Sequence, residues 1–260
     1  MNYAVLGLRG VLVISAGLLA LACSSDDANG GAGGNGGSGG GTCQTGTIAA
    51  SQVVLIGDSY LAQPGNNIQY YLENLARAAG ALEEGESYRP YYAGGTSMGN
   101  GQIPAQFDTA KAADPDIKLV IMTGGGNDIL IGNRACLTDP APQNESCVTT
   151  VDNSLAAAAE LYQNMAASGV EDVVYFSYPH LPTGFLTGPA ANEMLDYSYP
   201  RVQEACDSLT APDCHFIDTR PAFEGNASLI GPDGVHPTPA GSEVIANLIW
   251  DVMQDNCLAQ

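Results

Sequence analysis

The chain has 260 residues, 45% of them hydrophobic and 14% charged, which is enough to form a sizeable core in one or two domains. Eight Lys and Arg side chains against 28 Asp and Glu give a net charge of -20. This charge argues against nucleic-acid binding, which needs basic patches, and leaves no basic stripe for anionic lipids. The only long apolar run lies near the N-terminus, which excludes a protein with several membrane spans.

Residues 1–22 have the pattern of an export signal. Arg9 precedes the apolar run Val11–Ala22, which is too short for a comfortable membrane-spanning helix. Ala22-Cys23 also resembles the end of a bacterial lipobox, so we expect lipidation of Cys23. The alternative is cleavage at the same bond, which would release a soluble secreted protein.

Residues 23–44 have the composition of a flexible tether. Nine glycines lie between Asn29 and Gly41, and nothing in this stretch could form a core. A coil of this length spans roughly 25 Å. We therefore predict a cell-envelope lipoprotein held to a membrane by its lipid anchor only, and Ser24 after the cysteine resembles an outer-membrane address.

Six cysteines remain once Cys23 is set aside, and export would place them in an oxidising compartment. Six cysteines allow fifteen pairings, so the sequence does not fix the connectivity. Proximity in the sequence favours Cys136–Cys147, Cys206–Cys214 and Cys43–Cys257. Each bond would contribute about 2–4 kcal/mol to stability. A zinc site is the alternative, but the chain has no CxxC and no paired histidines, so we expect no metal.

Residues 45–260 alternate short strand-like runs with helical segments and read as one domain. The pattern predicts strands over 52–57, 91–93, 117–123, 170–178 and 215–218, and helices over 68–80, 103–113, 151–168, 190–209 and 239–256. Residues 132–148 are predicted to form a polar loop. Such alternation implies a parallel sheet covered by helices on both faces. Functional residues should then collect at the carboxyl ends of the strands.

Gly57-Asp58-Ser59-Tyr60 directly follows the first predicted strand. A serine in this turn lies at the functional edge of the sheet, and its hydroxyl can act as a nucleophile once a base takes its proton. The alternative is an ordinary turn serine or helix cap. The motif therefore indicates a candidate nucleophile that needs a partner elsewhere in the chain.

Asp233-Gly234-Val235-His236-Pro237 supplies that partner. A spacing of three lets the Asp233 carboxylate reach one imidazole nitrogen of His236 and leaves the other nitrogen facing Ser59. Pro237 favours an extended conformation for the histidine, and Thr238 with Pro239 predicts the start of the last helix. An Asp/His metal site is the weaker interpretation, because no other ligands cluster nearby.

Gly94-Gly95-Thr96-Ser97-Met98-Gly99 follows the second predicted strand, and its glycines allow a backbone N–H to approach a ligand oxygen closely. The same segment spells G-x-S-x-G, the nucleophile elbow of α/β-hydrolases, with Ser97 as the nucleophile. No HGGG segment precedes it, which argues against this alternative.

Gly124-Gly125-Gly126-Asn127-Asp128 follows the third predicted strand. The side-chain amide of Asn127 at this position can donate to a developing oxyanion. A phosphate-binding loop is the alternative, but no Lys follows and no G-x-G-x-x-G frames the motif. The segment therefore indicates acyl chemistry rather than nucleotide binding.

Together these four clusters resemble, in order, the motif blocks of the SGNH hydrolases, also called GDSL esterases and lipases. The resemblance runs from Gln52 to the C-terminus, with Tyr60 where many members have Leu. It implies an α/β fold, a flavodoxin-like three-layer α/β/α sandwich with a five-stranded parallel sheet. It also implies hydrolysis of carboxylic esters without a metal or organic cofactor.

The same resemblance assigns roles to single residues. Ser59 would be the nucleophile, His236 the general base and Asp233 the residue that orients the imidazole. The oxyanion hole would consist of the backbone N–H groups of Ser59 and Gly95 with the Asn127 amide. The register of the glycine is ambiguous by one, so the neighbouring Gly94 is the alternative.

The ester itself is not predicted. Small esters, acyl lipids, thioesters and acetylated glycans all fit, whereas the net charge disfavours anionic substrates. A non-catalytic surface binding module on the same scaffold is the second hypothesis, and we expect a monomer in either case. Of the remaining residues, His180 is predicted in a loop at the functional edge, His215 in a structural role and Trp250 in the core.

Overall fold

The computed structural model describes residues 48–63, 67–182, 184 and 187–259. The predicted signal peptide (1–22), the lipidation site Cys23, the tether (23–44) and Cys43 lie outside these residues. Within the described part of the chain, no helix combines the length and the apolar character that crossing a membrane requires.

Five parallel strands form one sheet in the order β2-β1-β3-β4-β5. Their bounds are β1 Val53–Ile56, β2 Arg89–Pro90, β3 Leu119–Met122, β4 Asp172–Phe176 and β5 Asp213–Ile217. All residues of β1 and β3 are fully buried, as expected of central strands with helices on both faces. The predicted five-stranded parallel sheet is confirmed.

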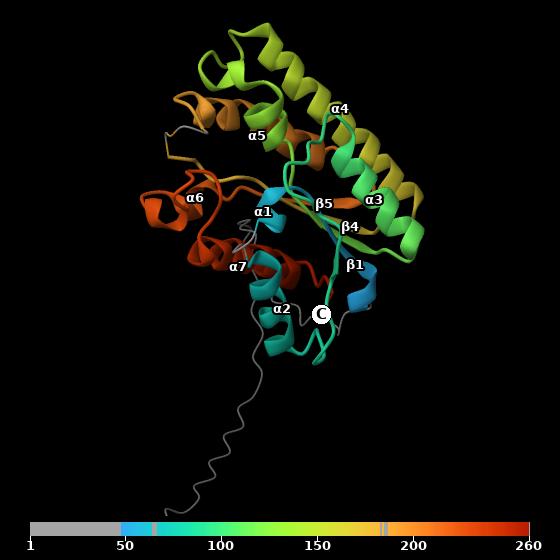
Figure 1. The fold of residues 1–260 in the computed structure, drawn as a ribbon. Coiled ribbons are helices and arrows are strands. Elements are labelled where there is room, and N and C mark those ends of the chain that lie inside the picture. The colour runs from blue at the N-terminus through green and yellow to red at the C-terminus, as the bar shows by residue number, and fades with distance from the viewer. Residues whose placement is uncertain (1–47, 64–66, 183, 185–186, 260) are drawn as a thin grey trace, which may run out of the picture. The chain divides into compact units, whose positions relative to one another are not determined.

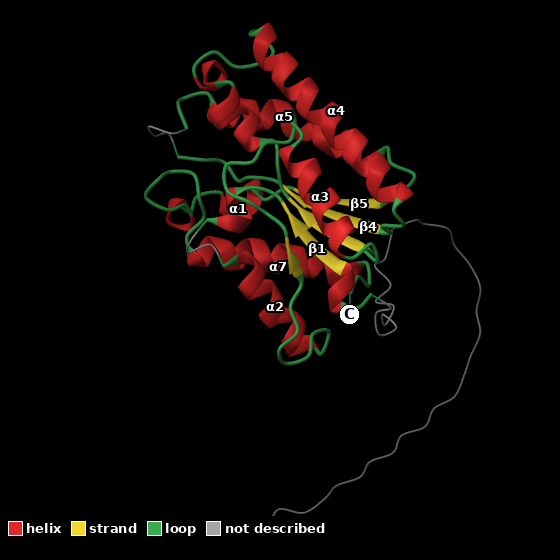
Figure 2. Ribbon diagram, turned by 45° about the vertical axis from the view of Figure 1, so that its right-hand side comes forward, coloured by secondary structure: helices red, strands yellow, loops and turns green. Residues whose placement is uncertain are grey.

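Helices cover both faces of this sheet. They are α1 Ser59–Ala62, α2 Ile68–Ala79, α3 Gln102–Ala113, α4 Glu145–Ala167, α5 Ala191–Asp207, α6 Arg220–Phe223 and α7 Pro239–Asp255. Figure 1 and Figure 2 show α3, α4 and α5 on one side of the strands and α2 with α7 on the other. This is the three-layer α/β/α sandwich, and its strand order is the flavodoxin-like one.

Alternate side chains of β1, β3 and β4 enter two separate cores. On β1, Val53 and Leu55 pack in the core that includes α2 and α7, whereas Val54 and Ile56 pack in the core that includes α3 and α4. Trp250 is 5% exposed and belongs to the first core, as predicted. The two cores fix the sheet between its helix layers, so the carboxyl ends of the strands form one edge.

Strands β3, β4 and β5 differ from their predicted ranges by one or two residues at an end, and two elements differ by more. The second strand comprises Arg89–Pro90 instead of residues 91–93. Beyond Pro90, Tyr91 N–H donates to Leu55 O in β1 and Ala93 N–H donates to Gly57 O just after β1, but these bonds do not extend the strand. Helix α4 begins at Glu145, six residues earlier than predicted.

The early start of α4 also corrects the predicted polar loop over 132–148. The Asn144 side chain caps the helix by accepting from Ser146 N–H at 3.0 Å, so a polar segment without apolar periodicity becomes helical. A 3-10 turn over Arg134–Leu137 occupies part of the remainder. By contrast, the predicted start of α7 is confirmed, with Thr238 as the capping residue and Pro239 as the first helical residue.

Two of the three predicted disulfides are present in the described residues. Cys136–Cys147 joins the 3-10 turn to the first turn of α4, with a Cα–Cα distance of 5.6 Å. Cys206–Cys214 joins the end of α5 to β5, with a Cα–Cα distance of 5.3 Å. The Cys43–Cys257 pair stays a prediction, because Cys43 lies outside the described residues.

Candidate active site

The turn after β1 presents Ser59 at the carboxyl edge of the sheet. Gly57 has φ +145°, and a Cβ at this position would lie 2.7 Å from Thr123 O, directly after the adjacent strand β3, so only glycine fits. The Asp58 carboxylate caps α1 by accepting from Tyr60 N–H at 3.0 Å. Ser59 is therefore the first residue of a helix that begins directly at the sheet edge.

Ser59, His236 and Asp233 form a hydrogen-bonded chain. The Ser59 Oγ lies 2.8 Å from His236 Nε2, and His236 Nδ1 lies 2.6 Å from Asp233 Oδ2. Serine and histidine are 177 positions apart in the sequence, so the fold alone brings them together. With Nδ1 protonated and donating to the carboxylate, Nε2 can accept the serine proton.

The Asp233 carboxylate is held in place by more than the imidazole. Its Oδ1 accepts from the backbone N–H groups of Val235 and His236, each at 3.0 Å. Partial burial opposes ionisation, but the bonds from the His236 ring and from these two N–H groups outweigh it and hold the pKa of Asp233 below its ordinary value. The carboxylate is thus ionised at neutral pH and fixes the orientation of the ring.

Glycine and amide groups lie beside the serine. A Cβ built on Gly94 would be 4.0 Å from the Ser59 Cβ, whereas one built on Gly95 would have nothing within 4 Å. Gly95 itself has φ +77°, which favours glycine for backbone reasons. Gly94 is therefore the glycine that faces the candidate nucleophile.

Asn127 is 4% exposed and donates from Nδ2 to Thr96 O at 3.0 Å. The amide nitrogen carries two hydrogens, so this bond orients the group and uses only one of them. The Thr96 hydroxyl in turn donates to Gly57 O at 3.0 Å. These bonds link the loops that follow β1, β2 and β3.

Two further side chains lock the same loops, and the sequence analysis did not assign them this role. Gln106 on α3 accepts from Gly57 N–H at 2.7 Å and donates to Gly57 O at 2.9 Å. Asp128 accepts from Met98 N–H at 2.9 Å and from Gly99 N–H at 2.7 Å. Asp128 lies within a recognised motif and could have been suspected, whereas nothing in the sequence marks Gln106.

The sequence analysis also did not predict a buried hydrogen-bond network that adjoins the triad. Asp58 is fully buried and accepts from the Tyr178 hydroxyl at 2.7 Å. The Tyr178 ring stacks on Tyr60 with centroids 3.8 Å apart, and the Tyr60 hydroxyl donates to Val235 O at 2.6 Å. Burial raises the pKa of Asp58 to about 6, against the lowering effect of its hydrogen bonds and of His236.

The other candidates lie apart from this arrangement. Ser97 is 6% exposed, and no hydrogen bond within the described residues joins it to a histidine, so the geometry does not favour the nucleophile elbow. His180 contacts Asp196 at 2.7 Å on the surface, and His215 contacts Asp172 at 2.9 Å across strands β5 and β4. In the part of the chain that the structure describes, no three or more His, Cys, Asp or Glu side chains are grouped to hold a metal ion.

The α/β/α fold and the Ser59–His236–Asp233 arrangement at the carboxyl edge of its sheet are typical of a hydrolase. The model of the GDSL-like lipase/acylhydrolase family matches residues 55–244, and the chain belongs to this family. The match begins within β1 and extends past His236, so it includes every motif described above. No curated protein sequence matches the chain significantly.

Solved structures with the same fold are distant in sequence. A lipase from a goat rumen metagenome superposes with a TM-score of 0.59 at 18% identity, covering 77% of this chain and 96% of that one. A lipase/acylhydrolase from Enterococcus faecalis gives 0.58 at 18% identity, covering 78% and 95%. The acetyl xylan esterase AlAXEase gives 0.56 at 15% identity, covering 77% and 98%. At these identities the likeness establishes the fold.

Proposed function

We propose that this protein is a serine esterase that hydrolyses carboxylic esters through an acyl-enzyme on Ser59. The observation that carries the proposal is the continuous chain of short bonds from Ser59 Oγ through His236 to Asp233. A serine hydroxyl is a weak nucleophile alone and becomes effective when an oriented imidazole takes its proton. The family match supports the same assignment.

The reaction has two halves. The Ser59 oxygen attacks the ester carbonyl carbon while His236 Nε2 takes its proton, and the tetrahedral intermediate collapses as the imidazolium returns the proton to the leaving alcohol. Water then attacks the acyl-enzyme by the same route and releases the acid. The Asp233 carboxylate stabilises the imidazolium in both halves and is not itself protonated.

The developing oxyanion would be held by the backbone N–H groups of Ser59 and Gly94 and by the Asn127 amide. The placement of Gly94 beside Ser59 favours it over Gly95 as the second backbone donor. The bond from Asn127 to Thr96 O holds the amide in a fixed orientation, which makes its remaining N–H a preorganised donor.

Turnover of p-nitrophenyl acetate tests the proposal. We expect the wild type to release p-nitrophenolate, Ser59→Ala to lose about 10⁴-fold or more in kcat, and Ser97→Ala to retain activity within a small factor. Loss of activity in Ser97→Ala with retention in Ser59→Ala would transfer the nucleophile to the elbow. Absence of turnover for the wild type over a panel of esters would favour a non-catalytic binding module.

We also propose that the enzyme is exported and anchored at the cell envelope through a lipid on Cys23. The support is the sequence alone, namely the short apolar run before Ala22-Cys23 and the glycine-rich stretch after it. Labelling of bacteria that express the full chain with a radioactive fatty acid should mark the wild type and leave Cys23→Ser unmarked. Equal labelling of both would place the lipid elsewhere, and labelling of neither would indicate a released protein.

A further inference from the structure

Tyr60 directly follows Ser59, and in the motif that names the GDSL-like family this position holds leucine. The tyrosine is fully buried in α1, and its hydroxyl donates to Val235 O at 2.6 Å. This bond joins the turn after β1 to the loop before α7, across 175 positions of the chain. A leucine side chain has no hydrogen-bonding group and could not make it. The departure from the family motif therefore adds a direct link between the segments that carry Ser59 and His236.

The peptide bond between Val235 and His236 is held at both of its polar groups. Its carbonyl oxygen accepts from the Tyr60 hydroxyl, and its N–H donates to Asp233 Oδ1 at 3.0 Å. Because a trans peptide group is planar with these two groups on opposite sides, the two bonds fix the plane that leads into the His236 Cα. The Tyr60 ring also lies beside the imidazole, with centroids 6.1 Å apart. These contacts bear on where His236 Nε2 lies relative to Ser59 Oγ.

Tyr178, two residues after β4, supports the Tyr60 ring from its other neighbours. The two rings stack with centroids 3.8 Å apart and planes 12° from parallel. The Tyr178 hydroxyl donates to Asp58 Oδ2 at 2.7 Å, and its backbone N–H donates to the Tyr199 hydroxyl at 2.8 Å. A Cβ on Gly126 would overlap the Tyr178 ring, so the loop after β3 packs closely against it. Tyr60 and Tyr178, which we call the tyrosine pair, thus contact the segments that follow β1, β3 and β4.

From this geometry we infer that the tyrosine pair positions the general base, with the Tyr60 hydroxyl holding Val235 O so that the imidazole of His236 stays within hydrogen-bond distance of Ser59. Tyr60 is a positioning residue, because it reaches the reaction only through the loop that carries the base. The inference rests on the proposed esterase function, since it assigns a role in that reaction. A shift of about 1 Å in the placement of a reacting group can cost roughly 10²-fold in rate.

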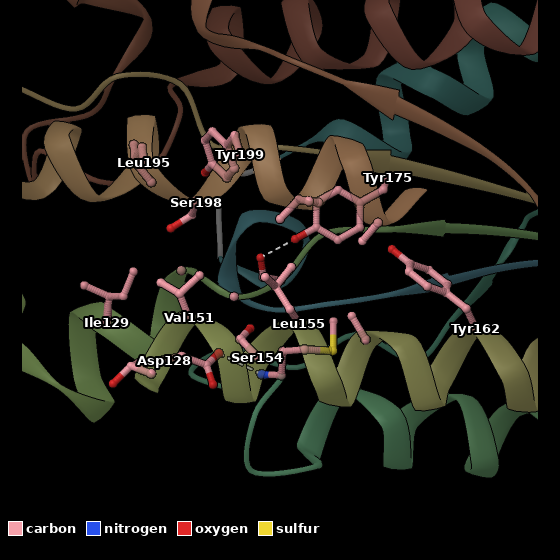
Figure 3. A pocket seen from close by; sticks show the side chains of 18 residues that line it. Asp128, Ile129, Val151, Ser154, Leu155, Tyr162, Tyr175, Leu195, Ser198 and Tyr199 are labelled. Carbon is pink, nitrogen blue, oxygen red and sulfur yellow. Dashed lines mark hydrogen bonds between the residues drawn. The ribbon is translucent and has the colours of Figure 1, made fainter. Parts of the chain in front are cut away.

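Tyr175 on β4 offers a matched control. Its hydroxyl donates to Gly124 O at 2.6 Å, and the dashed line in Figure 3 marks this bond. The residue is 3% exposed and lines the space between α4 and α5, away from the Ser59–His236 bond. Tyr60→Phe and Tyr175→Phe each keep a buried ring and remove one hydroxyl from a backbone carbonyl, so the two changes should reduce stability by similar amounts.

Steady-state turnover of p-nitrophenyl acetate tests the inference. We expect Tyr60→Phe to lower kcat by about 10-fold or more with KM within about 3-fold of the wild type, because the substrate is still bound but the base is misplaced. Tyr175→Phe should keep kcat within about 2-fold, although its thermal unfolding shifts as much. A folded Tyr60→Phe with the kcat of the wild type would overturn the inference. If that variant does not fold, Tyr60→Leu, which restores the residue of the family motif, takes its place with the same expectations.

A double-mutant cycle separates an effect on the base from a general effect on the site. Once His236→Ala has removed the imidazole, adding Tyr60→Phe should change the residual turnover by less than about 2-fold, with Ser59→Ala as the blank. An equal fall in kcat with and without His236 would mean that Tyr60 acts on the serine turn or on overall packing, and would contradict its role in placing the base.

Failure of this inference differs from failure of the proposed function. Absence of acetate turnover by the wild type would remove the esterase function itself. Turnover by the wild type that Tyr60→Phe leaves unchanged, or that Tyr60→Phe and Tyr175→Phe lower equally, would overturn only the role of the tyrosine pair.

Discussion

The two ends of the 124–128 loop face very different surroundings. Toward Ser59, the loop meets a dense set of directed contacts, in which Asn127, Thr96 and Gly57 are joined by hydrogen bonds near 3 Å. Toward α4 and α5, the same loop borders a space with apolar walls. Hydrogen bonds fix atomic positions to a fraction of an ångström, which the chemistry requires. Contacts with apolar walls are not directional and hold atoms less precisely. Changes on the first side should therefore alter turnover, and changes on the second should alter stability.

Apart from loss of the nucleophile itself, the largest effect is expected from Asp233→Asn, which changes the carboxylate that orients the His236 ring. An amide at this position would disfavour the imidazole tautomer that leaves Nε2 unprotonated, so kcat for p-nitrophenyl acetate should fall by roughly 10³–10⁴-fold with little change in KM. Asp251→Asn, an exposed carboxylate on α7, is the matched control and should leave kcat unchanged. A fall below 10-fold in Asp233→Asn would remove the carboxylate from the mechanism.

Asn127→Ala comes next in size. Removing one preorganised oxyanion donor typically lowers kcat by about 10²–10³-fold, and the effect should be the same for acetate and long-chain esters because it acts on the carbonyl. Asn247→Ala, an exposed asparagine on α7, serves as the control in the same steady-state assay. A fall in kcat of less than about 10-fold would contradict the role of Asn127 as an oxyanion donor.

Asp58→Asn is expected to change the pH dependence of stability. The pKa of Asp58 in the folded protein is about 6, above its ordinary 3.8, so between these pH values the native state binds more protons than the unfolded state. Stability is therefore lost as pH rises through this window, by about 3 kcal/mol in total. Denaturant unfolding from pH 4 to 7 should show Asp58→Asn gaining on the wild type by that order.

Several groups near Asp58 act on its pKa. Tyr178 and the Tyr60 N–H donate to the carboxylate, while the charges of His236 and Asp128 act in opposite directions. The variant keeps a side chain of the same shape, so packing is preserved. A difference in unfolding free energy between the variant and the wild type that stays constant over pH would show that Asp58 does not titrate in this range.

The smallest expected effect comes from the disulfide that joins the end of α5 to β5. Replacing Cys206 and Cys214 together by Ser opens a link of eight residues between α5 and β5, and the chain-entropy relation gives a loss of about 2.5 kcal/mol. Thermal unfolding should register the loss, whereas kcat for acetate should stay as in the wild type. A clear fall in kcat for acetate would mean that the link between α5 and β5 also holds the catalytic residues in place.

The sequence was a good guide wherever local patterns carry the information. The continuous apolar runs predicted β1 and β3, and the order of motifs predicted that Ser59, Asn127 and His236 follow strand ends or precede the last helix. Buried central strands and capped helices have short-range signatures that tertiary packing reinforces. The edge strand β2 was misplaced because two paired residues leave almost no pattern.

Long-range partners left no such signal. Tyr178 meets Asp58 across 120 positions, and Gln106 binds Gly57 across 49. Helical periodicity places Leu155 and Ala158 on the inward face of α4, but it does not say whether a side chain or a hollow lies opposite. The proposed preference for Gly94 over Gly95 likewise rests on the position of Ser59. These features depend on how elements pack, which one sequence does not reveal.

Covalent trapping of the nucleophile tests the central claim most directly. A p-nitrophenyl alkylphosphonate should react with the wild type so that the Ser59 oxygen forms a bond to phosphorus and p-nitrophenolate leaves, and peptide mass mapping should find the adduct on the peptide that contains Ser59. His236→Ala should slow the labelling by several orders of magnitude. An adduct on Ser97 or on another residue, or labelling of Ser59 at the same rate without His236, would contradict the account.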